Sequence, residues 1–100
     1  MADQLDYESF AGRTGETFRV VPPADVGEPL DLELVTLRTL EGSEHTKRAQ
    51  SFAIEFRGPQ DVALTQGMWR IEHPALGGHD IFLVPVGPDD KGLCYEAVFN

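Results

Sequence analysis

The chain has 100 residues, enough to bury one core and too few for two, so we expect a single domain over residues 1–100. Seventeen acidic residues against eight basic ones give a net charge of −9, which opposes binding to nucleic-acid phosphates or anionic lipid surfaces. No apolar run approaches the ~20 residues of a membrane helix, and the first residues lack the features of a signal peptide, so we expect a cytoplasmic protein.

The N-terminal part of the chain is predicted to contain a helical turn and a short strand. Asp6 is suited to cap a single turn that presents Tyr7 and Phe10 to the body of the domain. Residues 17–21 then form a β-type run that is halted by two consecutive prolines. This run is the first predicted strand.

The second predicted strand, residues 30–40, changes phase along its length. Leucines alternate with acidic residues up to Leu34, but the next apolar residues, Val35 and Leu37, fall on the opposite parity. A β-bulge or a sharp bend reconciles the two halves, and a bent strand of this kind can turn a corner between two sheets or around a small barrel. A helix over the same residues is the alternative, against which the alternating start argues. The polar segment 41–50 is interpreted as a loop.

Residues 51–59 and 67–74 are predicted to be the central strands of the fold. Within each segment, every second residue is apolar and is expected to face the core. These residues are Phe52, Ile54, Phe56, Trp69 and Ile71. The two-residue period is typical of a half-buried antiparallel sheet.

The two central segments are expected to pair with each other as one hairpin. Residues opposite each other in an antiparallel pair share a face, so we expect Phe56 opposite Trp69 on the core side. The same register sets Glu55 opposite Arg70 on the outer face, where their charges attract. Trp69 is therefore assigned to the core, in preference to a sugar-stacking platform.

The C-terminal part of the chain is predicted to contain two more strands. Residues 80–86 form an almost continuous apolar run, and residues 93–99 form the last strand. Pro85 lacks a ladder donor, so its side of the strand is expected to be an edge or a bulge. A strand that is apolar on both faces should be covered on both. We expect the N-terminal turn to cover part of the second face, and a partner or a second copy to cover the rest.

The sequence as a whole predicts an all-β fold. We expect a small antiparallel sandwich or partly open barrel of about six strands, with a short N-terminal helical turn. The single cysteine, Cys94, excludes an internal disulfide and is expected to pack in the interior instead of reacting.

Several segments resemble a family of small bacterial proteins of unknown function, of about this length. They are Glu8–Phe10, Gly15–Arg19, Ser51–Pro59, Gln66–Pro74, Phe82–Gly87 and Tyr95–Asn100, so the resemblance covers nearly the whole chain except residues 41–50. Members of that family are often encoded near proteins that resemble phage tail-collar or tail-fibre components. The resemblance therefore implies a role in or beside a phage-tail-like particle, and it supplies no activity, cofactor or catalytic residue.

Two histidines are the strongest candidates for a chemical site. His73 and His79 flank a predicted turn, and Glu72, Asp80 and His45 are possible further ligands for a metal. A zinc site needs three or four ligands in tetrahedral geometry, and no His-x-x-x-His or Cys-x-x-Cys spacing is present. We therefore predict no metal site, and expect His73 to lie at a strand end where Asp80 can hold it by a hydrogen bond.

A hydrolytic site would need a serine beside one of these histidines. Ser9, Ser43 and Ser51 are the candidates, and none lies in a Gly-x-Ser-x-Gly elbow. The neighbouring carboxylates of Asp89 and Asp90 lie in a predicted turn, where solvation is expected instead of catalysis. The sequence therefore predicts no catalytic, cofactor-binding or metal-binding residue.

The leading functional hypothesis is a non-catalytic structural or protein-interaction module, which binds another protein or itself. The net charge and the missing membrane span exclude nucleic acid and membrane as expected partners. One alternative is a metal-dependent or hydrolytic enzyme that uses His73 and His79. The other is a barrel that binds a small ligand, which requires an internal cavity.

Overall fold

The computed structural model describes residues 5–22, 27–39 and 51–99. These residues form one four-residue helix, α1 (Tyr7–Phe10), and six strands. The strands are β1 (Thr17–Val20), β2 (Leu30–Thr39), β3 (Phe52–Gly58), β4 (Gly67–His73), β5 (Gly77–Pro88) and β6 (Leu93–Phe99). Within the described residues, no helix is long and apolar enough to cross a membrane. The polar segment 41–50 lies outside them.

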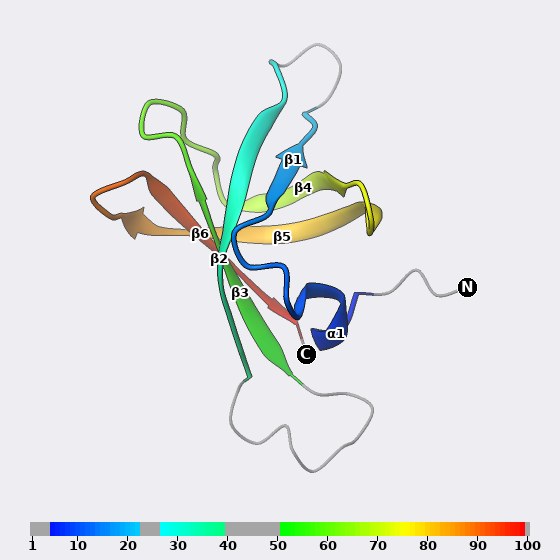
Figure 1. Ribbon diagram of the computed structural model, residues 1–100. Coiled ribbons are helices and arrows are strands. Elements are labelled where there is room, and N and C mark those ends of the chain that lie inside the picture. Colours follow the sequence, from blue (N-terminus) through cyan, green and yellow to red (C-terminus); the bar gives the residue numbers. More distant parts are fainter. Residues whose placement is uncertain (1–4, 23–26, 40–50, 100) are drawn as a thin grey trace.

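The six strands form one closed antiparallel barrel (Figure 1). Their order around the barrel is β1-β2-β3-β6-β5-β4, and β4 pairs with β1 to complete the circle. The all-β prediction, with about six strands and an N-terminal helical turn, is confirmed, and of the two architectures considered the barrel is the one found. Each strand therefore has a hydrogen-bonded neighbour on both sides.

Two irregularities bend the strands that build the barrel wall. The register of β2 against β3 shifts between Leu34 and Thr36, which confirms the bulge predicted at the change of phase. It lets Leu34 and Leu37 both face inward, opposite Phe56 and Ile54. A second shift, in β5 against β6, follows Pro85, where the missing N–H was expected to interrupt the ladder.

The predicted pairing of the two central segments is wrong. In the barrel β3 lies between β2 and β6, so Phe56 is opposite Leu34 and Tyr95. Trp69 of β4 is opposite Ile81 of β5. The physical reason is the length of the connections, since a tight turn joins β4 to β5, whereas residues 59–66 form a longer loop between β3 and β4.

The charge pairing predicted for that hairpin is wrong for the same reason. Arg70 is opposite Asp80, and its Nη1 lies 3.6 Å from Oδ1 of that carboxylate. Glu55 lies between Thr36 and Glu96. The faces were nevertheless predicted correctly, because alternation fixes which way a side chain points without fixing which strand is the neighbour.

The barrel interior is filled with side chains. The core combines large aromatic and branched residues from every strand with Phe10 of α1. Its largest fully buried members are Tyr95, Phe10, Phe18, Phe52, Phe56, Leu32, Leu34, Ile54, Ile71, Leu83 and Val20. Beside α1, an internal space of about 10 Å³ remains between the core side chains, which is no more than one water requires. This filled interior gives the small-ligand alternative no support.

Loops and α1 cover the two ends of the barrel. At one end the β3–β4 connection folds over the mouth, where the Leu64 N–H donates to the Tyr95 hydroxyl at 2.9 Å. Trp69 packs against the core at this end, but it is only half-buried, and its indole N–H donates to the Thr65 carbonyl at 2.9 Å. Trp69 therefore marks the margin of the core.

At the other end, α1 closes the barrel as a plug (Figure 1). Asp6 caps the helix as predicted, since its carboxylate accepts the Ser9 N–H at 3.0 Å. Phe10 is fully buried, and its ring centroid lies 5.9 Å from that of Phe52. The turn was expected to cover part of the outer face of residues 80–86, but the ring contacts of Tyr7 and Phe10 are with Phe18, Phe52 and Phe99, and Phe82 on that face remains 47% exposed.

Candidate functional site

The seam between β1 and β4 is the shortest junction of the barrel wall. Arg19 pairs with Glu72, and the Val21 N–H donates to the Arg70 carbonyl at 2.8 Å. Only every second pair of an antiparallel ladder is hydrogen-bonded, so the next bonding position after Glu72 on this strand is Pro74. Proline has no N–H to donate. The backbone ladder therefore stops there, and side chains must close the rest of the seam.

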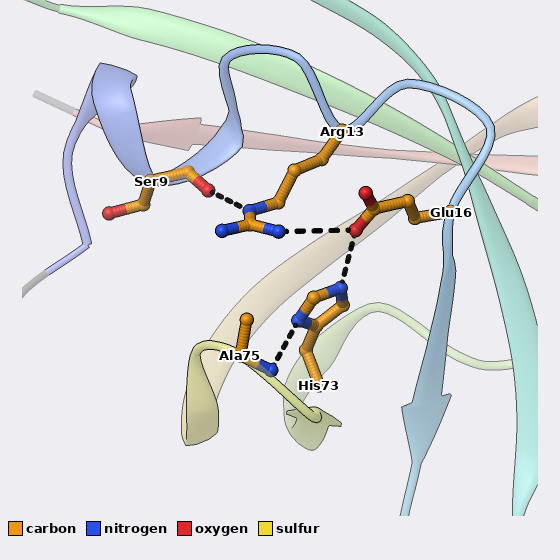
Figure 2. Close-up of polar contacts among 5 residues, drawn as sticks. All are labelled: Ser9, Arg13, Glu16, His73 and Ala75. Atoms are coloured by element: carbon orange, nitrogen blue, oxygen red, sulfur yellow. Dashed lines mark hydrogen bonds and ion pairs between the residues drawn. The ribbon is translucent and has the colours of Figure 1, made fainter.

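His73 fills the gap at the end of that ladder. Its side chain is 7% exposed, and its ring centroid lies 4.5 Å from that of Phe18. The Ala75 N–H donates to His73 Nδ1 at 3.0 Å, so this nitrogen carries a lone pair and no proton. The ring proton is therefore on Nε2, which donates to Glu16 Oε1 at 2.7 Å. Figure 2 shows this pair of contacts.

Arg13 links the same carboxylate to α1 (Figure 2). Its Nη1 lies 3.4 Å from Glu16 Oε1, and its Nε donates to the Ser9 carbonyl at 3.0 Å. A continuous chain of polar contacts thus runs from α1 through Arg13 and Glu16 to His73 at the end of β4. We refer to Arg13, Glu16 and His73 as the latch.

The latch changes the proton affinity of its carboxylate. The hydrogen bond from His73 is the largest effect and lowers the pKa of Glu16 below its ordinary value. Partial desolvation acts in the opposite direction, and Arg13 adds a smaller lowering effect. Glu16 is therefore stabilised as the charged acceptor that the latch requires.

We expect acid to weaken the barrel through the latch. The pKa of Glu16 is lower in the folded than in the unfolded chain, so its stabilising contribution is present above the unfolded pKa and is lost as pH falls through the folded one. Melting temperatures measured from about pH 7 to about pH 3 should therefore converge for the native protein and Glu16→Gln. The matched control, Glu28→Gln at an exposed loop position, should follow the native curve throughout. Parallel native and Glu16→Gln curves would contradict this role.

A surface hollow of about 540 Å³ lies outside the seam. Its wall is formed by residues of β1, β2 and the β4–β5 hairpin, namely Thr17, Arg19, Asp31, Glu72, His73, Pro74, Gly77 and Gly78. Arg19 and Asp31, cross-strand neighbours in this wall, form an ion pair at 3.3 Å. Both ring nitrogens of His73 are occupied within the chain, so no free histidine lone pair is offered to a ligand in the hollow.

The two candidate histidines are held separately. His79 Nε2 lies 2.7 Å from the Leu76 carbonyl oxygen, whereas His73 contacts Glu16 and Ala75. The expectation that Asp80 holds His73 is wrong. In the part of the chain that the structure describes, no group of three or more His, Cys, Asp or Glu residues could hold a metal ion. His45 lies outside the described residues.

Glu16 is the residue of this site that the sequence analysis missed. It lies 57 positions before His73, in a polar bend. Because the chain is rich in acidic residues, nothing in the sequence distinguishes Glu16 as a partner of His73. Ser9, one of the serines considered as a nucleophile, bonds through its hydroxyl to the Asp6 carboxylate at 2.9 Å and belongs to the helix cap. Ser51 lies just before β3, and Ser43 is outside the described residues.

Asp89, the other carboxylate considered, is part of a structural anchor. It accepts two bonds from the Arg57 guanidinium, at 2.7 and 3.0 Å, and the backbone N–H groups of Lys91 and Gly92. The Arg57 bond is the main reason that the pKa of Asp89 lies well below its usual range. Cys94 is buried, as predicted, and desolvation raises the pKa of its thiol, which is the direction expected of an inert cysteine.

The outer face of β4, β5 and β6 carries a group of large apolar side chains. Met68 is 65%, Phe82 47% and Val98 51% exposed, and Val84 is half-buried. Met68 and Phe82 are direct cross-strand partners. Val84 pairs with Glu96, two residues before Val98 on the same face of β6. We refer to Met68, Phe82, Val84 and Val98 as the outer patch.

Charged pairs border the outer patch on two sides. Arg70 and Asp80 follow the Met68–Phe82 pair along β4 and β5, on the same face. On the β6 side, Glu96 forms an ion pair with Arg38 of β2, which reaches over the buried Ala53 of β3. An apolar centre with a polar border is the arrangement typical of protein-interaction surfaces.

Comparison with known proteins identifies a family and no characterised relative. The model of a family described as "Domain of unknown function (DUF6916)" matches residues 5–99 of the chain. No curated protein and no solved structure gives a significant match.

Proposed function

The chain belongs to the DUF6916 family of domains of unknown function, and from this premise we propose that it is a non-catalytic module that binds another protein chain through the outer patch. The observation that carries the proposal is that Met68, Phe82 and Val98, each about half exposed or more, lie on the outer face of three neighbouring strands. Burial of such side chains in a complex removes apolar surface from water, which favours association. Scattered single residues would offer no comparable surface.

The contacts of the candidate chemical groups support the non-catalytic part of the proposal. A general base needs a lone pair within reach of its substrate, and both nitrogens of His73 are engaged within the chain. His79 bonds a backbone carbonyl, and Asp89 is held by Arg57. The alternative of an enzyme built on His73 and His79 has no observation in its favour.

The resemblance noted in the sequence adds a setting to the proposal. It implies a bacterial protein that acts in or beside a phage-tail-like particle, and we place it in the cytoplasm, where such particles would be assembled. In this setting the barrel is a structural component, and the outer patch is the surface by which it joins its neighbour. This part of the proposal rests on the resemblance, and the surface itself rests on the geometry.

Site-specific photo-crosslinking in the native cells tests the proposal. A photoreactive phenylalanine analogue at Phe82 should give a covalent protein adduct on irradiation, because the side chain points into the proposed interface. The matched control is the same analogue at Val62, a 43% exposed apolar residue of the β3–β4 connection, which should give none. Without an adduct at Phe82 or at Met68, in cells that contain the folded protein, the proposal fails.

A further inference from the structure

We propose that the occupant of the outer patch is a second copy of this chain, so that the domain forms a twofold dimer. The inference rests on the proposed function, since it names the partner of the same surface. Most closed homo-oligomers are twofold dimers in which one surface meets itself. Such a surface must be complementary to its own copy in charge as well as apolar at its centre.

The charges that border the outer patch meet this requirement. The chain carries more than twice as many acidic as basic residues, so two copies repel each other over most of their surfaces. The border of the patch is different, because it pairs Arg70 with Asp80 and Arg38 with Glu96. One positive charge accompanies each negative charge there. At these four positions two copies can therefore approach without net repulsion.

Two further acidic residues, Glu55 and Glu72, lie on the outer face near this border. Glu72 is two residues past Arg70 along β4, and Glu55 is on β3, on the far side of Glu96. Glu72 is farther from Phe82 than Arg70 is, whereas Glu55 lies on β3, nearer to β5 than Arg38 of β2. The charges directly beside the Met68–Phe82 pair, Arg70 and Asp80, match a surface of mixed charge like their own.

The pair Arg70 and Asp80 can serve both copies. Their side chains are 50% and 65% exposed, and the 3.6 Å separation of Nη1 from Oδ1 leaves most guanidinium donors free. Because the two residues are cross-strand neighbours beside the Met68–Phe82 pair, a twofold axis through the patch can bring Arg70 of one copy to Asp80 of the other, and the reverse. The same two residues then form two ion pairs across the interface.

Sedimentation equilibrium of the full chain measures the dimer directly. The native protein should reach twice the 11.0 kDa mass of the chain at high concentration. Phe82→Asp should weaken dimerisation by about 30-fold or more, the size typical of a central interface residue. The matched control Val62→Asp, outside the patch, should leave the dimer unchanged. A native protein that is monomeric throughout, or a dimer that Phe82→Asp does not weaken, overturns the inference.

A charge exchange tests the mode of pairing. Arg70→Asp should weaken self-association because it sets acidic residues against each other, and Asp80→Arg should do so with basic residues. An equimolar mixture of the two variants should form a mixed dimer at least as well as the native protein. If the native dimer depends on Phe82 but the mixture does not associate, the proposed crossing of Arg70 and Asp80 is wrong.

The two proposals fail separately. If crosslinking at Phe82 joins the chain to a different protein while the purified chain stays monomeric, the interaction surface stands and the second copy is the wrong occupant. If the purified chain dimerises through Phe82 and the adduct in cells has twice the chain mass, both proposals are supported.

Discussion

Replacing Phe10 by alanine should lower the free energy of unfolding by about 3–5 kcal/mol, the range typical of a buried phenylalanine. Phe10 is fully buried, and its ring centroid lies 5.7–6.1 Å from those of Phe18, Phe52 and Phe99. A helix of four residues is not stable by itself, so α1 depends on this contact to remain in place. The variant should therefore lose both the packing of one ring and the cover of the barrel end.

Urea denaturation followed by tryptophan fluorescence measures this loss. Glu8→Ala, on the exposed side of the same helix, is the matched control and should change stability by no more than about 0.5 kcal/mol. Removal of residues 1–11 should go further and uncover the rings of Phe18, Phe52 and Phe99, which an apolar dye reports. If Phe10→Ala is as stable as the native protein and the truncated chain binds no dye, α1 does not plug the barrel.

Replacing Gly92 by alanine should destabilise the barrel by about 1–3 kcal/mol or more, as overpacking of a closed site does. A Cβ at this position would overlap the carbonyl oxygen of Gly58 and lie 3.0 Å from Cγ of Arg57. The first of these atoms belongs to the backbone of β3, so a rotamer change cannot relieve the clash. The β5–β6 turn would have to move away, together with the Asp89 carboxylate that binds Arg57.

Gly78→Ala is the matched control for this prediction. A Cβ there would also meet atoms at 2.8–3.1 Å, but they belong to the guanidinium of Arg70, the flexible and half-exposed end of a side chain. This variant should therefore lose little stability. Both glycines lack a positive φ, so a difference between the two variants reports the room available for a methyl group and not backbone strain. Equal melting temperatures for the two variants would show that β3 and the turn are not held at this close approach.

The positions of the strands could be predicted from the sequence better than the pairing between them. Alternation identified the faces of β3 and β4, and the change of phase at Val35 located the bulge in β2. These are local signals, carried by residues within a few positions of each other. The pairing of β3 with β6 depends on contacts across about 40 positions, for which a single sequence contains no local signal.

For the candidate sites too, single residues could be predicted, but contacts between distant strands could not. His73 was recognised as a residue at the end of a strand, but Glu16 was not, because only the closed barrel brings the two together. The apolar run around Phe82 predicted a strand with two apolar faces and a surface in need of a partner. Sequence alone could not place Met68 beside Phe82, since that contact follows from the pairing of β4 with β5.

The position of β6 has a consequence for folding during synthesis. The last strand of the chain is inserted between β3 and β5, and it supplies the neighbour that each of them needs on one side. Until residues 93–99 have left the ribosome, β3 and β5 are therefore the two open edges of a single sheet with the order β3-β2-β1-β4-β5. Open edges of this kind promote pairing between chains. The nascent chain thus remains vulnerable to aggregation until β6 is available, and the arrival of β6 removes both edges in one step.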